Sequence, residues 1–502
     1  MLSAIVDRLP VLSRRGPRDV EVHKATADSR QAGPGSLFAA IPGLELDGHR
    51  FIGDAVDRGA TAVLLSRWPD QWPDKVVGLE VPDPRRSLAL AASVLEGEPA
   101  AALQVHAITG TNGKTTTAAI LRSILEAGGG RAGTLGTTGI LWTGPGGEVA
   151  REATHTTPEG PEFYRWLRQM VDDEVEAVAV ELSSHALHQG RVAGLAIDVA
   201  AWSNLGRDHL DYHHDLANYE AAKALLLSEW LATWGKSDAT FVLNVDDPIV
   251  RRHVTDWSRV LRVSSRPGAV VRGDADLAPL EPPAMSLDGI AVPVQWESEE
   301  GLLTTSLLGE HNLANCLLAG GCALGAGLSL AVVETGWRQT CGAPGRLQRV
   351  QREDGAGPIV VVDYAHTPGA LREAMGALRT LGPRRLITVF GCGGDRDMGK
   401  RPAMAAVAAE GSDLVILTSD NPRSEDPESI LDQVEAGLEG TTTSYLRHCD
   451  RRAAIAAAVG EASDGDVVLL AGKGHETWQE IAGQRYPFDD QVEAACALER
   501  WS

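Results

Sequence analysis

The chain has 502 residues, of which 43% are hydrophobic and 23% are charged, and its formal net charge is −22. This length exceeds what one hydrophobic core usually serves, so we expect three domains. The acidic excess excludes a general nucleic-acid binder, which needs a basic face. The apolar runs are as short as buried strands, and the first residues lack the pattern of an export signal, so we expect a cytoplasmic protein without membrane contact. The six cysteines show no metal-binding or CxxC spacing, which is typical of thiols in a reducing compartment.

The first hundred residues alternate short apolar runs with turns. The runs at 62–65 and 76–81 are separated from their neighbours by glycine and proline, and an alanine-rich amphipathic stretch follows at 87–95. The segment Glu96-Gly97-Glu98-Pro99 then interrupts the pattern. We therefore expect a first domain over residues 1–99.

From residue 103 onward, expected strands alternate with expected helices. A strand at 103–109 is followed by a helix at 116–127 and by strands at 177–182, 199–202 and 240–245. A second joint is expected at 342–345, and beyond it strands are expected at 359–363, 386–390, 414–418 and 467–470. This alternation predicts α/β domains with mostly parallel sheets over residues 100–342 and 343–502.

Almost every expected strand runs directly into an unusual polar loop. Ligands of open parallel sheets bind beyond the carboxyl ends of the strands. Two sets of such loops, on two domains, predict an active site in a cleft between those domains. The loops read TGTNGKTTT, ELSSH, SNLGRDHLDYH, NVDDP, DYAHTP, GCGGDRDMGKRP, SDNPRSEDP and AGKGHE.

The first of these loops has the composition of a phosphate-binding loop. Glycines let backbone amides wrap around phosphates, Lys114 neutralises phosphate oxygens, and the Thr115 hydroxyl can hold Mg²⁺. The strict pattern requires glycine at position 108, where this chain has Ile108, so the loop is a shortened variant. The alternative is a glycine-rich turn with an incidental lysine. We expect ATP as the ligand, bound by Gly110, Thr111, Asn112, Gly113, Lys114, Thr115 and Thr116.

Further motifs, in a fixed order, resemble the Mur ligase family over nearly the whole chain. The resemblance implies a UDP-binding domain, a central P-loop ATPase domain and a Rossmann-like C-terminal domain. It also implies a monomeric, ATP-dependent amide ligase of cytoplasmic peptidoglycan precursor synthesis, which acts through an acyl phosphate. The motifs are DSR (28–30), TLGTTG (134–139), HTTP (155–158), ELSSH (181–185), DHLD (208–211), YEAAK (219–223), NVDDP (244–248), GEHN (309–312), PGR (344–346), DYAH (363–366), GCGGDRDMGKR (391–401) and AGKGHE (471–476).

The resemblance implies a metal site and an ATP site. Two Mg²⁺ ions would be held by Thr115, Glu181, His209 and Lys223, and Lys223 would be a carbamate formed with CO₂, which requires a neutral amine. The alternatives are a solvated acid at Glu181, a structural histidine at His209 and an ordinary solvent-facing lysine at Lys223. Asn312, Arg346 and His366 would contact ATP, as would Asp363, and Arg346 would reach the γ-phosphate only on domain closure. The catalytic set is Lys114, Lys223, His209 and Arg346.

The resemblance also implies residues for the substrate UDP-N-acetylmuramoyl-L-alanyl-D-glutamate. Hydroxyl and amide groups would orient its sugar and peptide, and Arg191 would pair with a phosphate or carboxylate. The alternative for Gln189 and Arg191 is surface decoration on a loop. The expected residues are Ser29, Thr156, Thr157, Ser183, Gln189 and Arg191.

The sequence DNPR at 420–423 resembles the branch of the family that adds diaminopimelate. Arg423 would grip the distal carboxylate bidentately, Asn421 would bond beside it, and Glu476 would receive the distal ammonium. Two departures are Gly206-Arg207 before DHLDYH and the acidic run 424–427, which can cap the following helix. The full expected set is Arg396, Asp420, Asn421, Pro422, Arg423, Gly472 and Glu476.

Three alternatives remain at this point. Within the superfamily, the chain would be a lysine-adding, dipeptide-adding or folate polyglutamate ligase, against which DNPR and the DSR segment argue. A second alternative is an inactive relative that binds nucleotide, against which the retained Lys114, Thr115, Glu181, His209 and Lys223 argue. A third is a nucleic-acid P-loop motor, against which the net charge argues.

Overall fold

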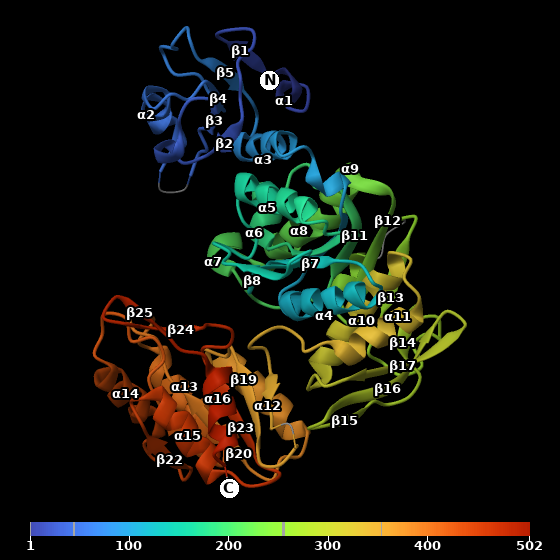
Figure 1. The fold of residues 1–502 in the computed structure, drawn as a ribbon, viewed down its shortest axis with the longest axis vertical. Coiled ribbons are helices and arrows are strands. Elements are labelled where there is room, and N and C mark those ends of the chain that lie inside the picture. Colours follow the sequence, from blue (N-terminus) through green and yellow to red (C-terminus); the bar gives the residue numbers. More distant parts are fainter. Residues whose placement is uncertain (1, 44–45, 254–256, 353, 502) are drawn as a thin grey trace. The chain divides into compact units, whose positions relative to one another are not determined.

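The computed structural model describes residues 2–43, 46–253, 257–352 and 354–501. The chain divides into two compact units, one of Met1–Ala278 with Leu317–Gly336 and one of Pro279–Cys316 with Trp337–Ser502. The helices and strands of both units are labelled in Figure 1.

The first unit begins with a five-stranded sheet in the order β1-β5-β4-β3-β2. Four strands are parallel, and β1 pairs antiparallel with β5. Asp83 caps α3 by accepting bonds from the amides of Arg85 and Arg86, and Pro84 occupies the first turn, where no amide donor is needed. The elements are α1 Leu2–Val6, β1 Ser13–Arg15, β2 Lys24–Thr26, β3 Ser36–Ala39, α2 Ile52–Asp57, β4 Ala62–Leu65, β5 Val77–Glu80 and α3 Pro84–Leu95.

This unit also contains part of a twelve-stranded sheet, in which its strands have the order β14-β13-β12-β11-β6-β10-β7-β8-β9. Strands β14 to β7 are parallel along this order, whereas β7, β8 and β9 form an antiparallel edge. The strands are β6 Gln104–Thr109, β7 Ala132–Gly136, β8 Gly139–Gly144, β9 Gly147–Arg151, β10 Ala177–Glu181, β11 Ile197–Trp202, β12 Gly235–Asn244, β13 Val260–Val263 and β14 Leu277–Pro279.

Helix α4 Lys114–Ala127 packs on β10 and β7 through the apolar stripe Ile120, Leu121, Ile124 and Leu125, which recurs at helical spacing. A second apolar layer includes Phe163 of α5, Leu187 of α6 and Trp230 of a π-helical turn at Leu226–Leu231. The remaining helices are α5 Gly160–Asp172, α6 Ser184–Gln189, α7 Leu210–His213, α8 Leu216–Leu225 and α9 Ala232–Trp234. Helices α10 Glu310–Gly325 and α11 Leu330–Gln339 contribute residues to both units.

The second unit contains the antiparallel strands β15 Ala284–Ser286, β16 Gly289–Trp296 and β17 Glu299–Thr305. Its main sheet has the order β18-β19-β23-β20-β21-β22 and is parallel except for β18. Its strands are β18 Gln348–Val350, β19 Ile359–Asp363, β20 Leu386–Phe390, β21 Leu414–Leu417, β22 Ser444–Arg447 and β23 Val467–Ala471. An antiparallel hairpin follows, made of β24 Trp478–Ile481 and β25 Gln484–Pro487.

Alternate residues of this sheet face two separate cores. Val361 and Leu469 pack with α12 Pro368–Thr380, α13 Lys400–Gly411 and α14 Pro427–Glu435. Val360 and Val468 pack with α15 Arg451–Glu461 and α16 Asp490–Glu499. Helices on both faces of a parallel sheet make this the expected Rossmann-like arrangement, and the expected α/β class is confirmed.

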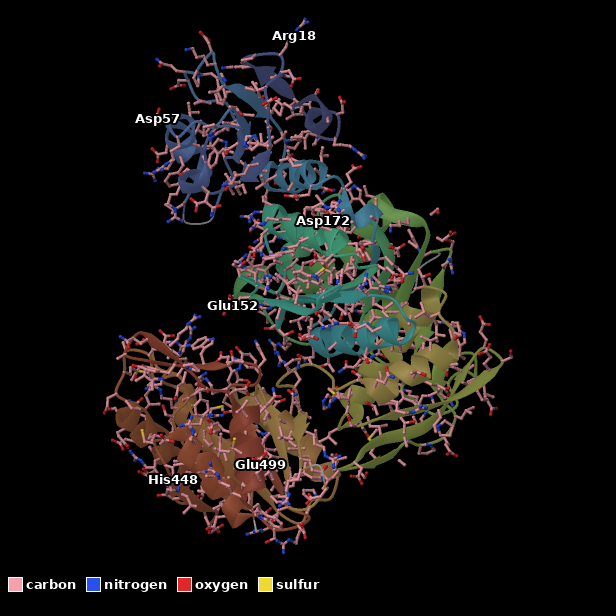
Figure 2. The ribbon with its side chains drawn as sticks, viewed as in Figure 1. Arg18, Asp57, Glu152, Asp172, His448 and Glu499 are labelled. Atoms are coloured by element: carbon pink, nitrogen blue, oxygen red, sulfur yellow. The ribbon has the colours of Figure 1, made fainter. Side chains whose placement is uncertain are left out.

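The acidic excess lies at the surface. The labelled carboxylates Asp57, Glu152, Asp172 and Glu499 are all exposed (Figure 2). In the described ranges, no helix combines the length and apolarity needed to cross a bilayer. All six cysteines are free thiols, as expected, and the buried pair Cys316 and Cys322 have pKa values raised by burial.

Candidate active site

The phosphate loop connects β6 to α4, which begins directly at Lys114. Gly110 and Gly113 have φ values of +148° and +86°, which favour glycine. A Cβ at Gly110 would lie 1.9 Å from the Ser203 hydroxyl oxygen. The Lys114 Nζ donates to the carbonyl oxygens of Gly110 at 2.8 Å and Thr111 at 2.9 Å. The loop therefore curls around its own lysine at a helix N-terminus, where anions are favoured.

The loop after β11 holds the phosphate loop in place. Asn204 accepts a bond from the Asn112 amide at 2.9 Å and donates its own side-chain amide to the Asn112 carbonyl at 2.9 Å. The Gly206 amide donates to the Thr111 hydroxyl at 2.8 Å. Gly206 departs from the family motif, but it contributes only a backbone amide to this contact. No side chain is therefore needed at this position.

Glu181 ends β10 beside the phosphate loop and is 2% exposed. Its Oε2 accepts bonds from the hydroxyls of Thr115 at 2.9 Å and Thr137 at 3.1 Å, and its Oε1 accepts the Thr137 amide at 2.9 Å. Burial raises the pKa of this carboxyl, and Lys114 opposes the rise. Glu181 is therefore not a solvated strand-end acid, and the structure brings it together with Thr115.

Lys223 on α8 is 1% exposed, so the alternative of a solvent-facing lysine is wrong. Its Nζ donates to the Gly110 carbonyl at 2.7 Å and lies 4.7 Å from the centre of the Tyr219 ring. Burial, together with the charge of Lys114, holds the pKa of the Lys223 ammonium well below its usual range. These surroundings therefore favour the neutral amine over the ammonium.

His209 precedes α7 in a left-handed conformation with φ +51°, and its side chain is 46% exposed. Its ring centre lies 4.8 Å from that of His185 and 6.2 Å from that of Tyr219. No group of three or more His, Cys, Asp or Glu side chains in the described part of the chain is arranged to hold a metal ion. The expected metal ligands include the Thr115 hydroxyl and a carbamate on Lys223, which are not among these side-chain types. The expected metal site therefore stays a prediction.

Five of the six residues expected to bind the peptide substrate are linked by hydrogen bonds near Glu181. The Thr157 hydroxyl donates to the Glu181 carbonyl at 2.7 Å and accepts the Ser183 amide at 3.0 Å, and the Thr156 and Thr137 hydroxyls are 3.1 Å apart. Ser29 lies elsewhere, in a 3₁₀ turn after β2 of the first sheet.

Arg191 belongs to the same network. Its guanidinium donates to the Thr157 carbonyl at 3.0 Å and to the Gln189 side-chain oxygen at 2.7 Å, and its side chain is 12% exposed. Surface decoration is therefore the wrong interpretation of Arg191. The same alternative placed Gln189 on a loop, but Gln189 is the last residue of helix α6.

In the second unit, the PGR segment packs tightly on the GKGH segment. A Cβ at Gly345 would lie 2.1 Å from the Gly474 carbonyl carbon, so the two backbones touch. The Arg346 guanidinium lies 5.1 Å from the centre of the Tyr364 ring, and Asp363 accepts the Leu347 amide at 2.8 Å. The two segments are therefore packed backbone against backbone, with no room for a side chain at residue 345.

The other two expected ATP contacts are engaged locally. Asn312 is 2% exposed, and its amide donates to the Leu308 carbonyl at 2.9 Å. The His366 Nδ1 lies 2.7 Å from the Tyr364 carbonyl oxygen.

The residues expected to bind diaminopimelate converge after β21. Asn421 donates to the Glu476 carboxylate at 2.8 Å, and the Arg423 guanidinium donates to the Gly394 carbonyl at 2.7 Å. A Cβ at Gly472 would lie 2.6 Å from the Asp420 carboxylate, so glycine is required there. Pro422 and Arg396 lie beside the Gly393-Gly394 turn. In the acidic run, Asp426 caps α14, as expected.

Sequence reasoning gave no role to three residues of these sites. Thr137 lies in the TLGTTG motif and Tyr219 in the YEAAK motif, and their hydroxyl groups are the sequence features that could have indicated a role. Lys473 is buried beneath Asn421 and Glu476, and only its place in AGKGHE distinguished it.

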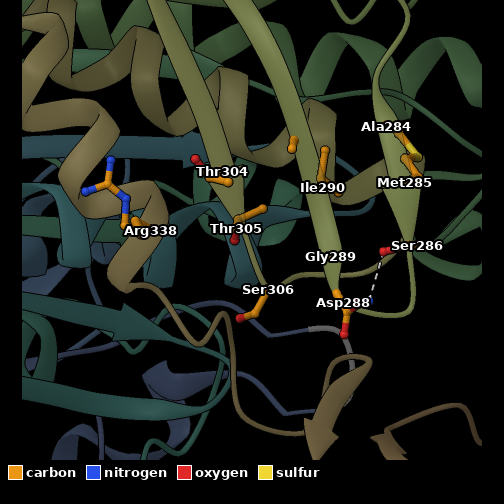
Figure 3. Close-up of a pocket in the computed structure, with 11 residues that line it drawn as sticks. Ala284, Met285, Ser286, Asp288, Gly289, Ile290, Thr304, Thr305, Ser306 and Arg338 are labelled. Carbon is orange, nitrogen blue, oxygen red and sulfur yellow. Dashed lines mark hydrogen bonds between the residues drawn. The ribbon is translucent and has the colours of Figure 1, made fainter.

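A separate pocket of about 450 Å³ lies beside β15, β16 and β17 (Figure 3). Its walls include Met285, Ile290, Thr304 and Arg338. None of the expected site residues lines it, so it is distinct from the loops described above.

Comparisons with known proteins agree over the whole chain. Residues 21–95 match the Mur ligase family, catalytic domain; residues 108–323 match the Mur ligase middle domain; and residues 345–474 match the Mur ligase, glutamate ligase domain. The chain is 38% identical over 500 residues, 99% of each chain, to UDP-N-acetylmuramoyl-L-alanyl-D-glutamate–2,6-diaminopimelate ligase from Geobacillus thermodenitrificans. It is 41% identical to the ligase of the same name from Xanthomonas oryzae pv. oryzae, over 96% of this chain and 95% of that one.

A solved structure of a UDP-N-acetylmuramoyl-L-alanyl-D-glutamate–2,6-diaminopimelate ligase is similar with a TM-score of 0.70 and 32% identity, and the match covers 95% of each chain. Three family models in order, full-length relatives and a solved fold lead to one conclusion: the chain belongs to the Mur ligase family.

Proposed function

We propose that the chain is the ATP-dependent ligase that adds diaminopimelate to UDP-N-acetylmuramoyl-L-alanyl-D-glutamate in peptidoglycan precursor synthesis. The relatives from Geobacillus and Xanthomonas carry this activity in their names. The observation that carries the choice of amino acid is the convergence of Arg423, Asn421 and Glu476 after β21.

The nucleotide is ATP, bound by the loop 110–116 with Lys114 against its phosphates. The cations are Mg²⁺, and the buried carboxylate of Glu181 beside the Thr115 hydroxyl fits such an ion. His209 and a carbamate on Lys223 complete the proposed site, and the lowered pKa of Lys223 supplies the neutral amine that the carbamate requires. When bound, the metal neutralises charge on the phosphates and on the substrate carboxylate.

Two steps join the carboxylate to the amine. A carboxylate oxygen of the UDP-linked dipeptide first attacks the γ-phosphorus, which forms an acyl phosphate and releases ADP. The amine of the amino acid then attacks the acyl carbon, phosphate leaves, and the amine loses a proton. Lys114 and Arg346 are proposed to stabilise the negative charge of the transferring phosphoryl group. Thr156, Thr157, Ser183, Gln189, Arg191 and, at the UDP end, Ser29 are proposed to orient the dipeptide substrate.

The amino-acid site is built for a molecule with two ammonium–carboxylate centres. The Arg423 guanidinium donates to the Gly394 carbonyl at 2.7 Å, and its Nε lies 3.7 Å from the Glu480 carboxylate. The guanidinium is proposed to bind the distal carboxylate as well. The Glu476 carboxylate receives the distal ammonium, and Arg396 receives the carboxylate beside the reacting amine. Lysine lacks the distal carboxylate, so the ion pair proposed between that group and Arg423 would not form, which is the physical basis for rejection.

We further propose a cytoplasmic monomer that binds neither nucleic acid nor membrane, with domain boundaries after residues 99 and 342. The acidic net charge supports the absence of nucleic-acid binding.

Ligation by the purified protein tests the function. The protein would receive ATP, Mg²⁺ and UDP-N-acetylmuramoyl-L-alanyl-D-glutamate, with meso-diaminopimelate, LL-diaminopimelate or L-lysine in separate reactions and the product weighed by mass spectrometry. We expect product with a diaminopimelate isomer and little with lysine. Product mainly with lysine would reject the role of the 420–423 loop. ATP binding without any product would favour an inactive relative.

A further inference from the structure

The loop that carries Arg423 is bonded to the β24–β25 hairpin. The Arg423 amide donates to the Glu480 carbonyl at 3.0 Å, and the Arg423 carbonyl accepts the Ala482 amide at 2.7 Å. The Gln479 side chain donates to the Asp420 carbonyl at 2.5 Å. The hairpin therefore acts as an added strand beside the loop, with Arg423 paired in parallel to Ile481.

This pairing matters because Arg423 has an unfavourable backbone. Its φ is +52°, in the left-handed region that non-glycine residues rarely adopt. A residue keeps such a conformation only where its surroundings over-determine it. Here both backbone polar groups of Arg423 are bonded to the hairpin, so the hairpin sets the direction in which the guanidinium leaves the chain.

Lys473 ties the hairpin to the other side of the amino-acid site. Its side chain is fully buried, and its Nζ donates to the Trp478 carbonyl at 2.6 Å. The same Nζ lies 3.3 Å from the Asn421 side-chain oxygen and 3.4 Å from Glu476 Oε2. One cation thus fixes the start of the hairpin, the Asn421 amide and one oxygen of Glu476.

The two oxygens of the Glu476 carboxylate have different surroundings because of Lys473. Oε2 is engaged by Lys473 and by the Asn421 amide at 2.8 Å. Oε1 is the oxygen that can meet a substrate ammonium. Asn421 cannot turn, because its oxygen also accepts the Glu480 amide at 2.9 Å.

We propose that Lys473 and the hairpin 478–487 are positioning elements that set amino-acid specificity, by holding Arg423, Asn421 and Glu476 at the spacing of a second ammonium–carboxylate centre. This inference rests on the proposed function. Lys473 is fully buried and bonded to protein groups, so it acts through the residues that it orients.

Two variants test the proposal, with one control. Lys473→Met removes the donor but keeps the length of the side chain, and Gln479→Met removes the bond to Asp420 without altering the buried lysine. Gln484→Met is the matched control, because the Gln484 side chain is exposed in β25 and, among the described residues, bonds only the Tyr486 hydroxyl of the same hairpin. Each protein would be assayed for kcat and for the KM of the amino acid, ATP and the UDP-linked dipeptide.

We expect the KM for diaminopimelate to rise about tenfold or more in Lys473→Met and less in Gln479→Met. The KM values for ATP and the dipeptide should stay unchanged, and the preference for diaminopimelate over lysine should fall. Amide hydrogen exchange at 420–424 should accelerate in Lys473→Met, while exchange in β19 and β20 stays as in the wild type. An unchanged preference, or an equal change in all three KM values, would overturn the proposal.

The outcomes separate this inference from the proposed function. A wild type that prefers lysine rejects the diaminopimelate assignment, and a selective rise in the KM for lysine would then still support positioning by Lys473. A wild type that forms no product rejects the proposed function, and hydrogen exchange alone then decides. Unchanged exchange at 420–424 in Lys473→Met would overturn the positioning role in either case.

Discussion

Replacing Lys223 should show whether this side chain acts as a carbamate or is an ordinary buried amine. Lys223→Ala removes the side chain that donates to the Gly110 carbonyl at 2.7 Å. The lost hydrogen bond is worth only about 1 kcal/mol, and removing a buried amine offsets part of that cost. Folding should therefore survive. Activity should not, because the anion that completes the proposed metal site is gone.

The activity loss follows from the charge that disappears. A preorganised group that stabilises developing charge is typically worth about 3–4 kcal/mol, or about 10²–10³ in kcat. Formate or acetate can enter the space left by the side chain and supply a carboxylate where the carbamate stood. We therefore expect kcat to fall by about 10²–10³ and to recover partly with added formate.

The assay is the initial rate of UDP-tripeptide formation with and without formate. Lys236→Ala is the matched control, because Lys236 also donates to a backbone carbonyl, that of Leu103 at 2.7 Å, but lies at the other end of β12 from the polar loops. A carbamate carbon signal from ¹³C-labelled bicarbonate should be present in the wild type and absent in Lys223→Ala. An unchanged rate without any formate effect, or a signal that survives the substitution, would refute the reasoning.

Three further results are expected. Lys114→Met should abolish ATP-dependent ligation while far-ultraviolet circular dichroism stays unchanged, and retained turnover would contradict the phosphate role. Arg423→Lys should lower the preference for diaminopimelate over lysine about tenfold or more, measured as a ratio of kcat/KM, since a point charge replaces a bidentate fork. Asp466 is desolvated, but Arg384, Arg385 and the Ser463 amide lower its pKa from 3.8 to about 2. Because its folded pKa lies below its unfolded value, its contribution of about 2 kcal/mol is present above pH 4 and is lost as the pH falls toward 2. Asp466→Asn should therefore lower the urea midpoint at pH 7, and the difference should shrink through that window; a difference independent of pH would contradict this.

The parallel strands were predictable because both faces of each are covered. The apolar runs expected at 103–109 and 467–470 correspond to β6 and β23 within one residue at each end. The antiparallel edges were not expected, since β9 and β25 are largely exposed and show no apolar alternation. The domain boundaries at 99 and 342 stay predictions.

The contact between Thr115 and Glu181 follows from the rule that parallel strands end at one edge of a sheet. The contact between Thr137 and Glu181 instead depends on how closely the two strands pack, which the sequence does not show. A Cβ at Gly136 would lie 1.9 Å from Glu181, so this glycine lets the Thr137 amide and hydroxyl reach the carboxylate. The burial of Lys223 was equally invisible in AAKALLL, where the lysine occupies an ordinary helical position. Only the packing of α8 against the phosphate loop gives it a lowered pKa.

The contact between Gly345 and Gly474 has a mechanical consequence. Their backbones are too close for any side chain, so no side chain separates the segment carrying Arg346 from the segment carrying Glu476. A displacement of one segment is passed directly to the other. Arg346, proposed to stabilise the transferring phosphoryl group, and Glu476, proposed to receive the distal ammonium, would then move together. Any movement of Arg346 is therefore expected to shift the position of Glu476.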